Sequence, residues 1–283
     1  MTNKISEPDI ETALLEVIDK DDPVIVIYSA IWSFAHRLGG DVKEATSRIF
    51  DVINSVVGED RTILFPTFTN QFVKTKRFDI ALDDSDCSGV LANYAFRSPG
   101  FKRTRQPIHS YVVKGPLSEE VLNRPCSTAW GDDSVIGWMG EVNARFCPIG
   151  LPWHYACSFY HRIEELNQVP YRYYKRFPGL LLDNGHEIGT CAEVKYSYSL
   201  NVTPEFDHTI VEPCLEKIGA IRKSSNPLVP IQSAKGHDIL KVTSELLSRD
   251  EYAYVKNREE VKAWVMDGKE QEVSSLKQEE RWP

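Results

Sequence analysis

The chain has 283 residues, of which 42% are hydrophobic and 26% are charged, and its 33 Lys and Arg against 41 Asp and Glu give a net charge of −8. This composition supplies enough apolar side chains for a core, which excludes global disorder, and no apolar stretch approaches the roughly 18 residues of a transmembrane helix. The acidic balance argues against nucleic-acid binding and the N-terminus lacks the apolar segment of a secretory signal, so we expect a cytoplasmic protein with neither a nucleic-acid nor a membrane partner.

The first 70 residues predict a strand–helix–strand unit preceded by a further helix. The run VIVIYSA is apolar and β-branched, which is typical of a strand buried on both faces of a sheet. Asp41 and Glu44 stand at the spacing of a capping box, and Gly58 closes the helix that follows. The expected elements are helices from about Pro8, with Ser6 as its cap, to 20 and over 42–57, and strands over 24–30 and 62–65. This order predicts an α/β fold with helices on both faces of the sheet.

The remaining elements are predicted from shorter patterns. Residues 67–99 are irregular and polar, which is typical of a functional loop or a lid. From about Asp267 the charged C-terminus is expected to be poorly ordered. Strands are expected over 111–113, 144–150 and 190–202, a helix from Ser158 as N-cap to before Val169, and helices around 205–218, 238–249 and 257–266. Because no linker is recognisable, we expect one large α/β domain over residues 1–283.

The segment around His161 carries the clearest candidate for chemistry. Glu164 and Glu165 follow this histidine at i+3 and i+4, on the same helical face. An adjacent carboxylate orients an imidazole and is expected to raise its pKa. Sites of open α/β sheets lie beyond the carboxyl ends of strands, where this pair is placed for general-base work. The alternative is an ordinary surface pair.

A second interpretation of the same segment is a zinc site. Cys147, His154, Cys157 and His161 are of residue types that suit tetrahedral zinc, although their spacing matches no established pattern. We therefore expect free thiols and no metal. Trp153 and His154 either line a pocket or pack under the turn.

The familiar nucleotide and hydrolase signatures are missing from the sequence. It contains no G-x-x-x-x-G-K-[ST], no G-x-G-x-x-G, no G-x-S-x-G and no H-E-x-x-H. Nucleotide hydrolysis, hydride transfer and ordinary esterase chemistry are correspondingly disfavoured. His109, at the start of a predicted strand, is either a satisfied structural group or part of a site.

Five blocks of the sequence follow one another in an order that a known family shares. They are VIVIYSA through Ser33 with Gly39-Gly40; TILFPTFT at 62–69; the run from Phe78-Asp79 through SPG at 98–100 and Arg103 to PIHS at 107–110; WGDDS at 130–134; and CPIG at 147–150 with SFYHRIE at 158–164. In this order they resemble the motifs of the aminoglycoside 3-N-acetyltransferase family. The resemblance covers residues 12–180 well and the C-terminal third loosely.

The resemblance implies a three-layer α/β/α single domain with a central mixed sheet and a helical C-terminal third. It implies an N-acetyltransferase that uses acetyl-CoA and a small-molecule amine, with a homodimer as an open alternative to a monomer. By position, His161 would be the general base, Glu164 would stand beside it, and His109 would belong to the same site. The acetyl-CoA site would comprise Ser29, Ala30, Ser33, His109, Ser110, Trp130, Gly131 and Ser134, and the acceptor site Thr67, Phe68, Asp79, Trp153 and His154. The donors to the oxyanion would be backbone amides near Ser29-Ala30 or the Ser110 hydroxyl.

The sequence also departs from the family pattern. Tyr28 and Ala30 replace the outer residues of its HSS motif, Gln106 replaces a histidine, and Val135 follows Ser134 in place of proline. The stretch VKYSYSLNV at 194–202 lacks the acidic residues that hold polycationic aminoglycosides, for which Asp79, Asp83, Asp84 and Asp86 are candidate substitutes. We therefore prefer an amino sugar of surface-polysaccharide biosynthesis as the acceptor. The alternatives are an aminoglycoside acceptor, which would confer antibiotic resistance, and a non-catalytic domain that binds small molecules.

Overall fold

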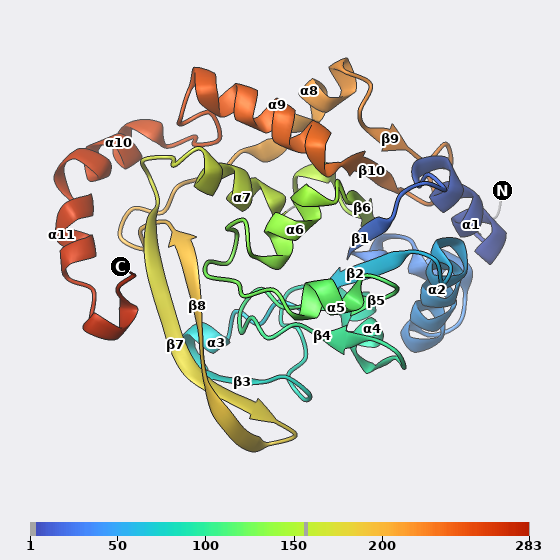
Figure 1. Cartoon of the computed structure of the whole chain (residues 1–283). Helices are drawn as coiled ribbons and strands as arrows, with labels where there is room; N and C mark the ends of the chain where they lie inside the picture. Colours follow the sequence, from blue (N-terminus) through green and yellow to red (C-terminus); the bar gives the residue numbers. More distant parts are fainter. Residues whose placement is uncertain (1–3, 156–157, 283) are drawn as a thin grey trace.

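The computed structural model describes residues 4–155 and 158–282. Among these residues, seven strands form a mixed sheet in the order β4-β5-β2-β1-β6-β10-β9 (Figure 1). Strand β1 pairs in parallel with β2 and β6, and the outer strands join in antiparallel fashion. The strands are β1 (Val24–Ser29), β2 (Thr62–Pro66), β4 (Lys102–Arg103), β5 (Tyr111–Lys114), β6 (Arg145–Ile149), β9 (Arg222–Lys223) and β10 (Gln232–Lys235). The predicted central mixed sheet is thus confirmed.

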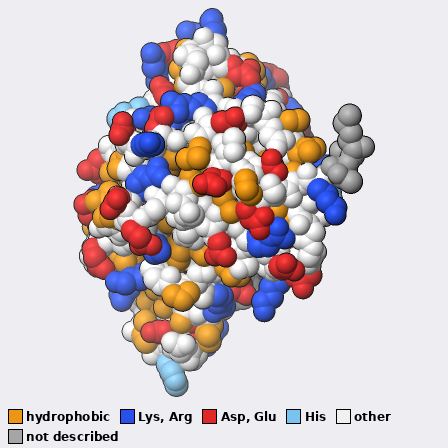
Figure 2. Space-filling view, turned by 90° about the vertical axis from the view of Figure 1, so that its right-hand side faces the viewer, with side chains coloured by type: hydrophobic (Ala, Val, Ile, Leu, Met, Phe, Trp, Pro, Cys, Tyr) orange, Lys and Arg blue, Asp and Glu red, His pale blue; other side chains and the backbone are white. Residues whose placement is uncertain are grey.

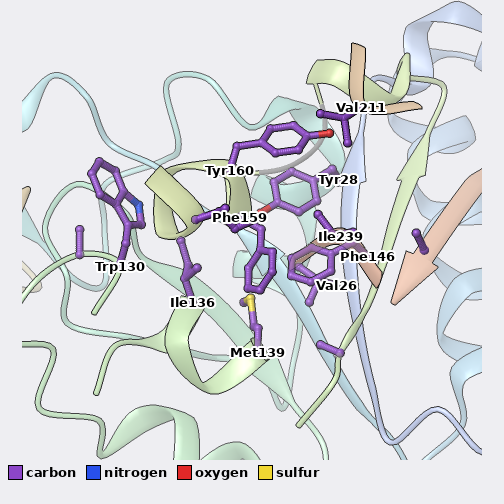
Figure 3. Packing of buried hydrophobic residues seen from close by; sticks show 14 of the residues in the cluster. Val26, Tyr28, Trp130, Ile136, Met139, Phe146, Phe159, Tyr160, Val211 and Ile239 are labelled. Carbon is purple, nitrogen blue, oxygen red and sulfur yellow. The ribbon is translucent and has the colours of Figure 1, made fainter. Parts of the chain in front are cut away.

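Helices cover both faces of this sheet, and the side chains of β1 point alternately into the core on one face and the core on the other. Val24 and Val26 face one core, and Ile25 and Ile27 face the other. The first core is covered by α6 (Val135–Glu141), α7 (Phe159–Leu166), α8 (Val211–Lys217) and α9 (Gly236–Arg249), and the second by α1 (Glu7–Val17), α2 (Val42–Val57) and α4 (Gly89–Arg97). Figure 3 shows the first core, where Phe146 and Phe159 face each other with ring centroids 4.9 Å apart. The three-layer α/β/α arrangement is therefore as predicted.

The caps of the first two long helices follow the sequence signals. Ser6 and Asp9 form a capping box at the start of α1, and the Asp41 side chain accepts a hydrogen bond from the Glu44 backbone at the start of α2. Gly58 ends α2 with a φ of 72°, a backbone conformation that glycine adopts without strain. Ser158 holds the N-cap position of α7 as predicted, but its side chain makes no capping hydrogen bond.

A second, three-stranded sheet was only partly predicted. It has the order β3-β7-β8, with strands β3 (Arg77–Asp79), β7 (Tyr173–Asp183) and β8 (His186–Ser197). Strands β7 and β8 form the long hairpin that extends away from the main sheet in Figure 1. Asn184 and Gly185 both have positive φ in the connecting turn, which suits a tight hairpin. The segment expected as an irregular loop at 67–99 holds α3 (Phe72–Thr75), β3 and α4.

The C-terminal residues are folded against the hairpin, where a poorly ordered tail was expected. They form α10 (Arg258–Asp267), α11 (Lys269–Ser274) and η5 (Gln278–Glu280). The Glu272 carboxylate accepts hydrogen bonds from Tyr173 and Trp264, and Lys175 pairs with Glu280. Composition alone misled the prediction, because the charged side chains in this segment have partners on β7.

Short elements complete the chain, and its surface carries mixed charges. These elements are α5 (Ser118–Leu122), η1 (Ile31–Ser33), η2 (Ala35–Leu38), η3 (Trp153–Tyr155) and η4 (His208–Ile210). On the side of the molecule that carries α1 and α2, acidic and basic side chains are interspersed (Figure 2). None of the helices in the described part of the chain combines the length and apolarity needed to cross a bilayer.

Candidate active site

Two cavities meet beside the amino end of α7. The first, which we call the strand-end cavity, has a volume of about 890 Å³ and is lined by the end of β1 and the first turns of α2 and α4. The second, which we call the hairpin cavity, has a volume of about 690 Å³ and lies between β7, β8 and the C-terminal segment. Phe68 and Ser158 line both cavities. Both volumes are in the range of small-molecule sites.

Glycines allow the loops of the strand-end cavity to approach each other closely. Gly150 follows β6 with a φ of +69°, and a Cβ there would lie 2.6 Å from the Ala30 carbonyl oxygen. Gly89 begins α4 with a φ of +84°, and a Cβ there would lie 3.0 Å from the Ser29 carbonyl oxygen. A larger residue at either position would push the end of β1 away from the cavity wall.

His161 lines the hairpin cavity from the first turn of α7, and its side chain is 30% exposed. Its Nδ1 lies 2.9 Å from Glu164 Oε2, as the i+3 spacing predicts. The ring of Trp130 packs on the imidazole with centroids 4.9 Å apart. The imidazole is therefore fixed on one side by a carboxylate and on one face by an indole, with its remaining edge towards the cavity.

Glu164 is fully buried and remains ionised because other groups balance its charge. Arg172 Nη2 lies 2.7 Å from Glu164 Oε2, and the Tyr171 hydroxyl donates to Oε1 at 2.9 Å. Burial alone would raise the pKa of Glu164, but Arg172 and the hydrogen bond with His161 lower it to about 2. Arg172 is itself buried and donates to the Tyr196 carbonyl at 2.9 Å. A permanent carboxylate thus faces His161 Nδ1.

The protonation state of His161 differs from the prediction. Although one edge of the ring meets the cavity, protein encloses the rest, and this burial lowers the pKa of His161 to about 4. Glu164 acts in the opposite direction, and the Arg172 charge adds to the lowering. The expected raised pKa is therefore wrong, because the sequence shows the carboxylate but not the burial. Arg172 Nη2 also lies 3.0 Å from His161 Nδ1, so the guanidinium and the Glu164 carboxylate compete for this nitrogen. In the tautomer whose Nδ1–H donates to Glu164, Nε2 keeps a free lone pair at neutral pH.

His109 forms a second histidine–carboxylate pair in the hairpin cavity. Its Nδ1 hydrogen-bonds to Glu193, whose Oε2 also accepts from the backbone N–H groups of Ile108 and His109 at 2.8 and 3.0 Å. Burial lowers the pKa of His109, although Glu193 acts against this shift. Trp130 lies between the two histidines, with its ring centroid 5.3 Å from that of His109. His109 is thus both satisfied by a partner and part of the cavity wall.

Several predicted site residues lie where their side chains serve the fold. Thr67, Ser110 and Ser134 are buried, and their hydroxyl groups hydrogen-bond within the protein. The Asp79 carboxylate accepts from four backbone N–H groups, at Ala81, Leu82, Asn184 and Gly185, and joins β3 to the hairpin turn. Trp153 is fully buried in the first core. Within the described residues, neither cavity is lined by Asp79, Asp83, Asp84 or Asp86.

The predicted cofactor residues fall into two groups. Ser29 and Ala30 line the strand-end cavity, and Phe68 lines both cavities as an expected acceptor contact. Trp130 lines the hairpin cavity instead, while Ser33 turns its hydroxyl to the Ala30 carbonyl. Gly131 lies beside the Glu165 and Thr128 side chains and His154 lies in η3, and neither residue lines a cavity in the described structure.

The sequence interpretation missed several residues of the site. Glu193 lies directly before the stretch at 194–202, which was taken to lack acidic side chains. Together with Lys195 and Ser197 it occupies every second position along β8. That alternation was a usable signal, because every second residue of a strand shares a face. Arg172 reaches Glu164 from eight residues away, and no local pattern marks it. Trp32, 80% exposed at the wall of the strand-end cavity, was also overlooked.

The zinc interpretation gains no support from the described residues. No group of three or more His, Cys, Asp or Glu in residues 4–155 and 158–282 is arranged to hold a metal ion. Cys147 is buried in β6, and burial raises its pKa to about 12. Cys157 lies outside the described residues.

Comparisons with known proteins agree with the fold. A family model described as aminoglycoside 3-N-acetyltransferase matches residues 33–234, more than half of the chain. A comparison with curated proteins found no match.

Among solved structures, a mutant of aminoglycoside acetyltransferase AAC(3)-IVa in complex with a gentamicin has a TM-score of 0.74 at 16% identity, over 94% of this chain and 98% of that one. AAC-IIIb in a binary complex with CoASH has a TM-score of 0.69 at 16% identity, over 87% and 97%. YokD from Bacillus subtilis has a TM-score of 0.69 at 13% identity, over 88% and 95%. The family match, together with this shared fold, shows that the chain belongs to the aminoglycoside 3-N-acetyltransferase family.

Proposed function

We propose that the protein transfers the acetyl group of acetyl-CoA to a primary amine of a sugar-like acceptor, with His161 as the general base. The observation that carries this proposal is the imidazole of His161, held by the buried carboxylate of Glu164 close to where two cavities meet. One cavity is then available for the thioester and the other for the amine. Phe68 and Ser158, which line both, mark the point at which the reacting groups would come together.

The strand-end cavity suits acetyl-CoA. Its walls are largely apolar, with Ile31, Val42 and Ala45 among the lining residues, as a pantetheine chain requires. The exposed indole of Trp32 offers a flat surface for an adenine ring. Helix α4 begins at this cavity without a side-chain cap, so its first N–H groups are available to phosphate oxygens.

In the proposed reaction His161 first accepts a proton and then donates it. His161 Nε2 takes a proton from the acceptor nitrogen, which attacks the thioester carbonyl carbon. The new C–N bond forms as the carbonyl oxygen becomes an oxyanion. The C–S bond then breaks, and the CoA sulfur leaves as a thiolate that takes up the proton from His161. Glu164 stabilises the imidazolium that exists between the two proton transfers.

The oxyanion donors expected from the sequence already have other partners. The Ala30 N–H donates to the Ile149 carbonyl at 2.9 Å, and the Ser110 hydroxyl donates to the Thr67 carbonyl at 2.7 Å. Ser158 is a better candidate, because it lines both cavities and does not use its hydroxyl to cap α7. We therefore assign the oxyanion contact to Ser158.

Two acceptor classes are supported by different observations. The comparisons favour an aminoglycoside over the surface-polysaccharide sugar that the sequence analysis preferred, because the similar structures include enzymes with gentamicin and sisomicin bound. The lining of the hairpin cavity favours a different acceptor, because Lys76, Lys175 and Lys195 contribute to it. A biosynthetic amino sugar is therefore kept as the second candidate.

Release of free thiol from acetyl-CoA, followed with a panel of amines, tests the proposal. The panel should include gentamicin, kanamycin and simple amino sugars, with the H161A variant as the control for the base. A CoA-dependent rise in melting temperature tests the strand-end cavity separately, since a ligand at one hundred times its Kd stabilises by about 2.7 kcal/mol. Absence of both thiol release and a thermal shift would favour the non-catalytic alternative.

A further inference from the structure

Three lysine side chains converge in the hairpin cavity around a single aromatic ring. The ammonium groups of Lys76, Lys175 and Lys195 lie 5.7, 5.6 and 5.8 Å from the centroid of the Phe177 ring. All three line the cavity, and they come from the end of α3, from β7 and from β8. Positive charge is therefore gathered at one place from three separate segments.

The placement of these lysines is unfavourable for the free protein. Lys175 and Lys195 stand directly opposite each other in the antiparallel pairing of β7 and β8. Like charges at opposed positions destabilise a sheet. Among the described residues, Lys76 and Lys195 make no ion pair, whereas Lys175 pairs with Glu280 at 3.3 Å. Burial lowers the pKa of Lys195, and the Glu193 carboxylate acts against this shift without forming an ion pair with the ammonium group.

The carboxylates of the same cavity are already committed to the protein. Glu272 accepts hydrogen bonds from Tyr173, Ser199, Asn201 and Trp264. Glu280 pairs with Lys175. A cationic acceptor would therefore find few free acceptor oxygens and two unpaired ammonium groups.

We infer that the hairpin cavity binds an acceptor that carries a phosphate group, held by Lys76, Lys175 and Lys195, with the amine directed towards His161. This inference rests on the proposed function, because it specifies the acceptor of that reaction. Lysine binds phosphate as a compact point charge, and three such charges around one ring suit a group with several anionic oxygens. A phosphorylated amino sugar meets this description, whereas a polycationic aminoglycoside would be repelled.

Calorimetric titration of inorganic pyrophosphate into the full-length protein tests the inference. Saturating CoA keeps pyrophosphate out of the strand-end cavity. We expect binding that K76Q and K195Q each weaken by at least about tenfold, since each removes a charge-assisted contact. K195R should retain most of the affinity. K74Q is the matched control, because Lys74 is an exposed lysine of α3 that does not line the cavity in the described structure, and this variant should bind as the wild type does.

The inference would be overturned by a lack of pyrophosphate binding, by equal binding to K76Q, K195Q and K74Q, or by tighter binding of gentamicin than of pyrophosphate. Malonate tests a carboxylate ligand, and affinity equal to that of pyrophosphate would refute the phosphate assignment. Failure of the transferase proposal would look different. In that case pyrophosphate would bind, but no amine would release thiol from acetyl-CoA. If gentamicin instead released thiol and pyrophosphate did not bind, only the phosphate site would be refuted.

Discussion

The buried pair of Glu164 and Arg172 should dominate the stability of the site. Both side chains are almost inaccessible to solvent, at 0% and 1% exposure. A pKa of about 2 for Glu164, against an ordinary 4.5, corresponds to about 3 kcal/mol of favourable interaction at roughly 1.4 kcal/mol per pKa unit. Removing one partner of a buried pair typically costs about 3–5 kcal/mol. We therefore expect E164Q and R172M each to lower the free energy of unfolding at pH 7 by about 3 kcal/mol.

A double-mutant cycle separates the pair from its surroundings. The E164Q/R172M protein leaves no uncompensated charge, so its loss should be smaller than the sum of the single losses by about 3 kcal/mol. Urea unfolding at pH 7 measures all four proteins. E119Q is the control, because the pair of Glu119 and Lys102 is exposed and should contribute less than about 1 kcal/mol.

The stability that Glu164 contributes depends on pH in one direction. The folded-state pKa of Glu164 is lowered, so its stabilisation is fully present above its ordinary value and is lost as the pH falls towards about 2. The difference between wild type and R172M should therefore shrink between pH 7 and pH 3. Strictly additive single losses, or a difference that grows on acidification, would refute the electrostatic reasoning.

Four further results are expected. H161A should lower kcat by about 10²–10⁴-fold, measured by thiol release, while the protein still unfolds cooperatively in urea. In the free wild-type protein, the imidazole of His161 followed by NMR should titrate near its pKa of about 4; a midpoint at pH 6.5 would contradict this. D79A should cost about 1–3 kcal/mol of stability and leave KM unchanged, because the carboxylate serves four backbone N–H groups. W32A should raise KM for acetyl-CoA about two- to tenfold without changing the melting temperature, since the side chain is 80% exposed. Truncation after Gly268 should cost about 2 kcal/mol in thermal or urea unfolding, because it uncovers Trp264 and Tyr173.

The elements that the sequence predicted well are those whose signals are local. The apolar run of β1 and the caps of α2 each depend on a few neighbouring residues, and both were placed correctly. Strand β7 was not predicted, and it carries in its middle Pro178 and Gly179, a pair that is typical of turns. The structure accommodates the proline because β3 pairs only with residues 180–182, which leaves Pro178 with a single neighbouring strand.

The contact between His161 and Glu164 was predicted from their spacing, whereas the pKa of His161, which burial decides, was not. The spacing of His161 and Glu164 correctly indicated a hydrogen-bonded pair. The direction of the His161 pKa shift could not be derived from that spacing, because it depends on how much protein encloses the ring. Asp79 illustrates the opposite error, since an aspartate in a polar segment was taken for a ligand contact and proved to be a backbone acceptor.

The positive groups of the hairpin cavity would serve catalysis as well as binding. Burial lowers the pKa of His161 and the charge of Arg172 adds to this lowering, which keeps the imidazole neutral. The same field would lower the pKa of an acceptor ammonium group, and so raise the fraction of free amine, which is the nucleophilic form. If the acceptor also carries a phosphate on Lys76 and Lys195, its anion balances the charge of the wall while its nitrogen lies in the positive region near Arg172. One arrangement of charges would then select the acceptor and activate its amine, which a wall rich in carboxylates could not do, because carboxylates stabilise the ammonium form.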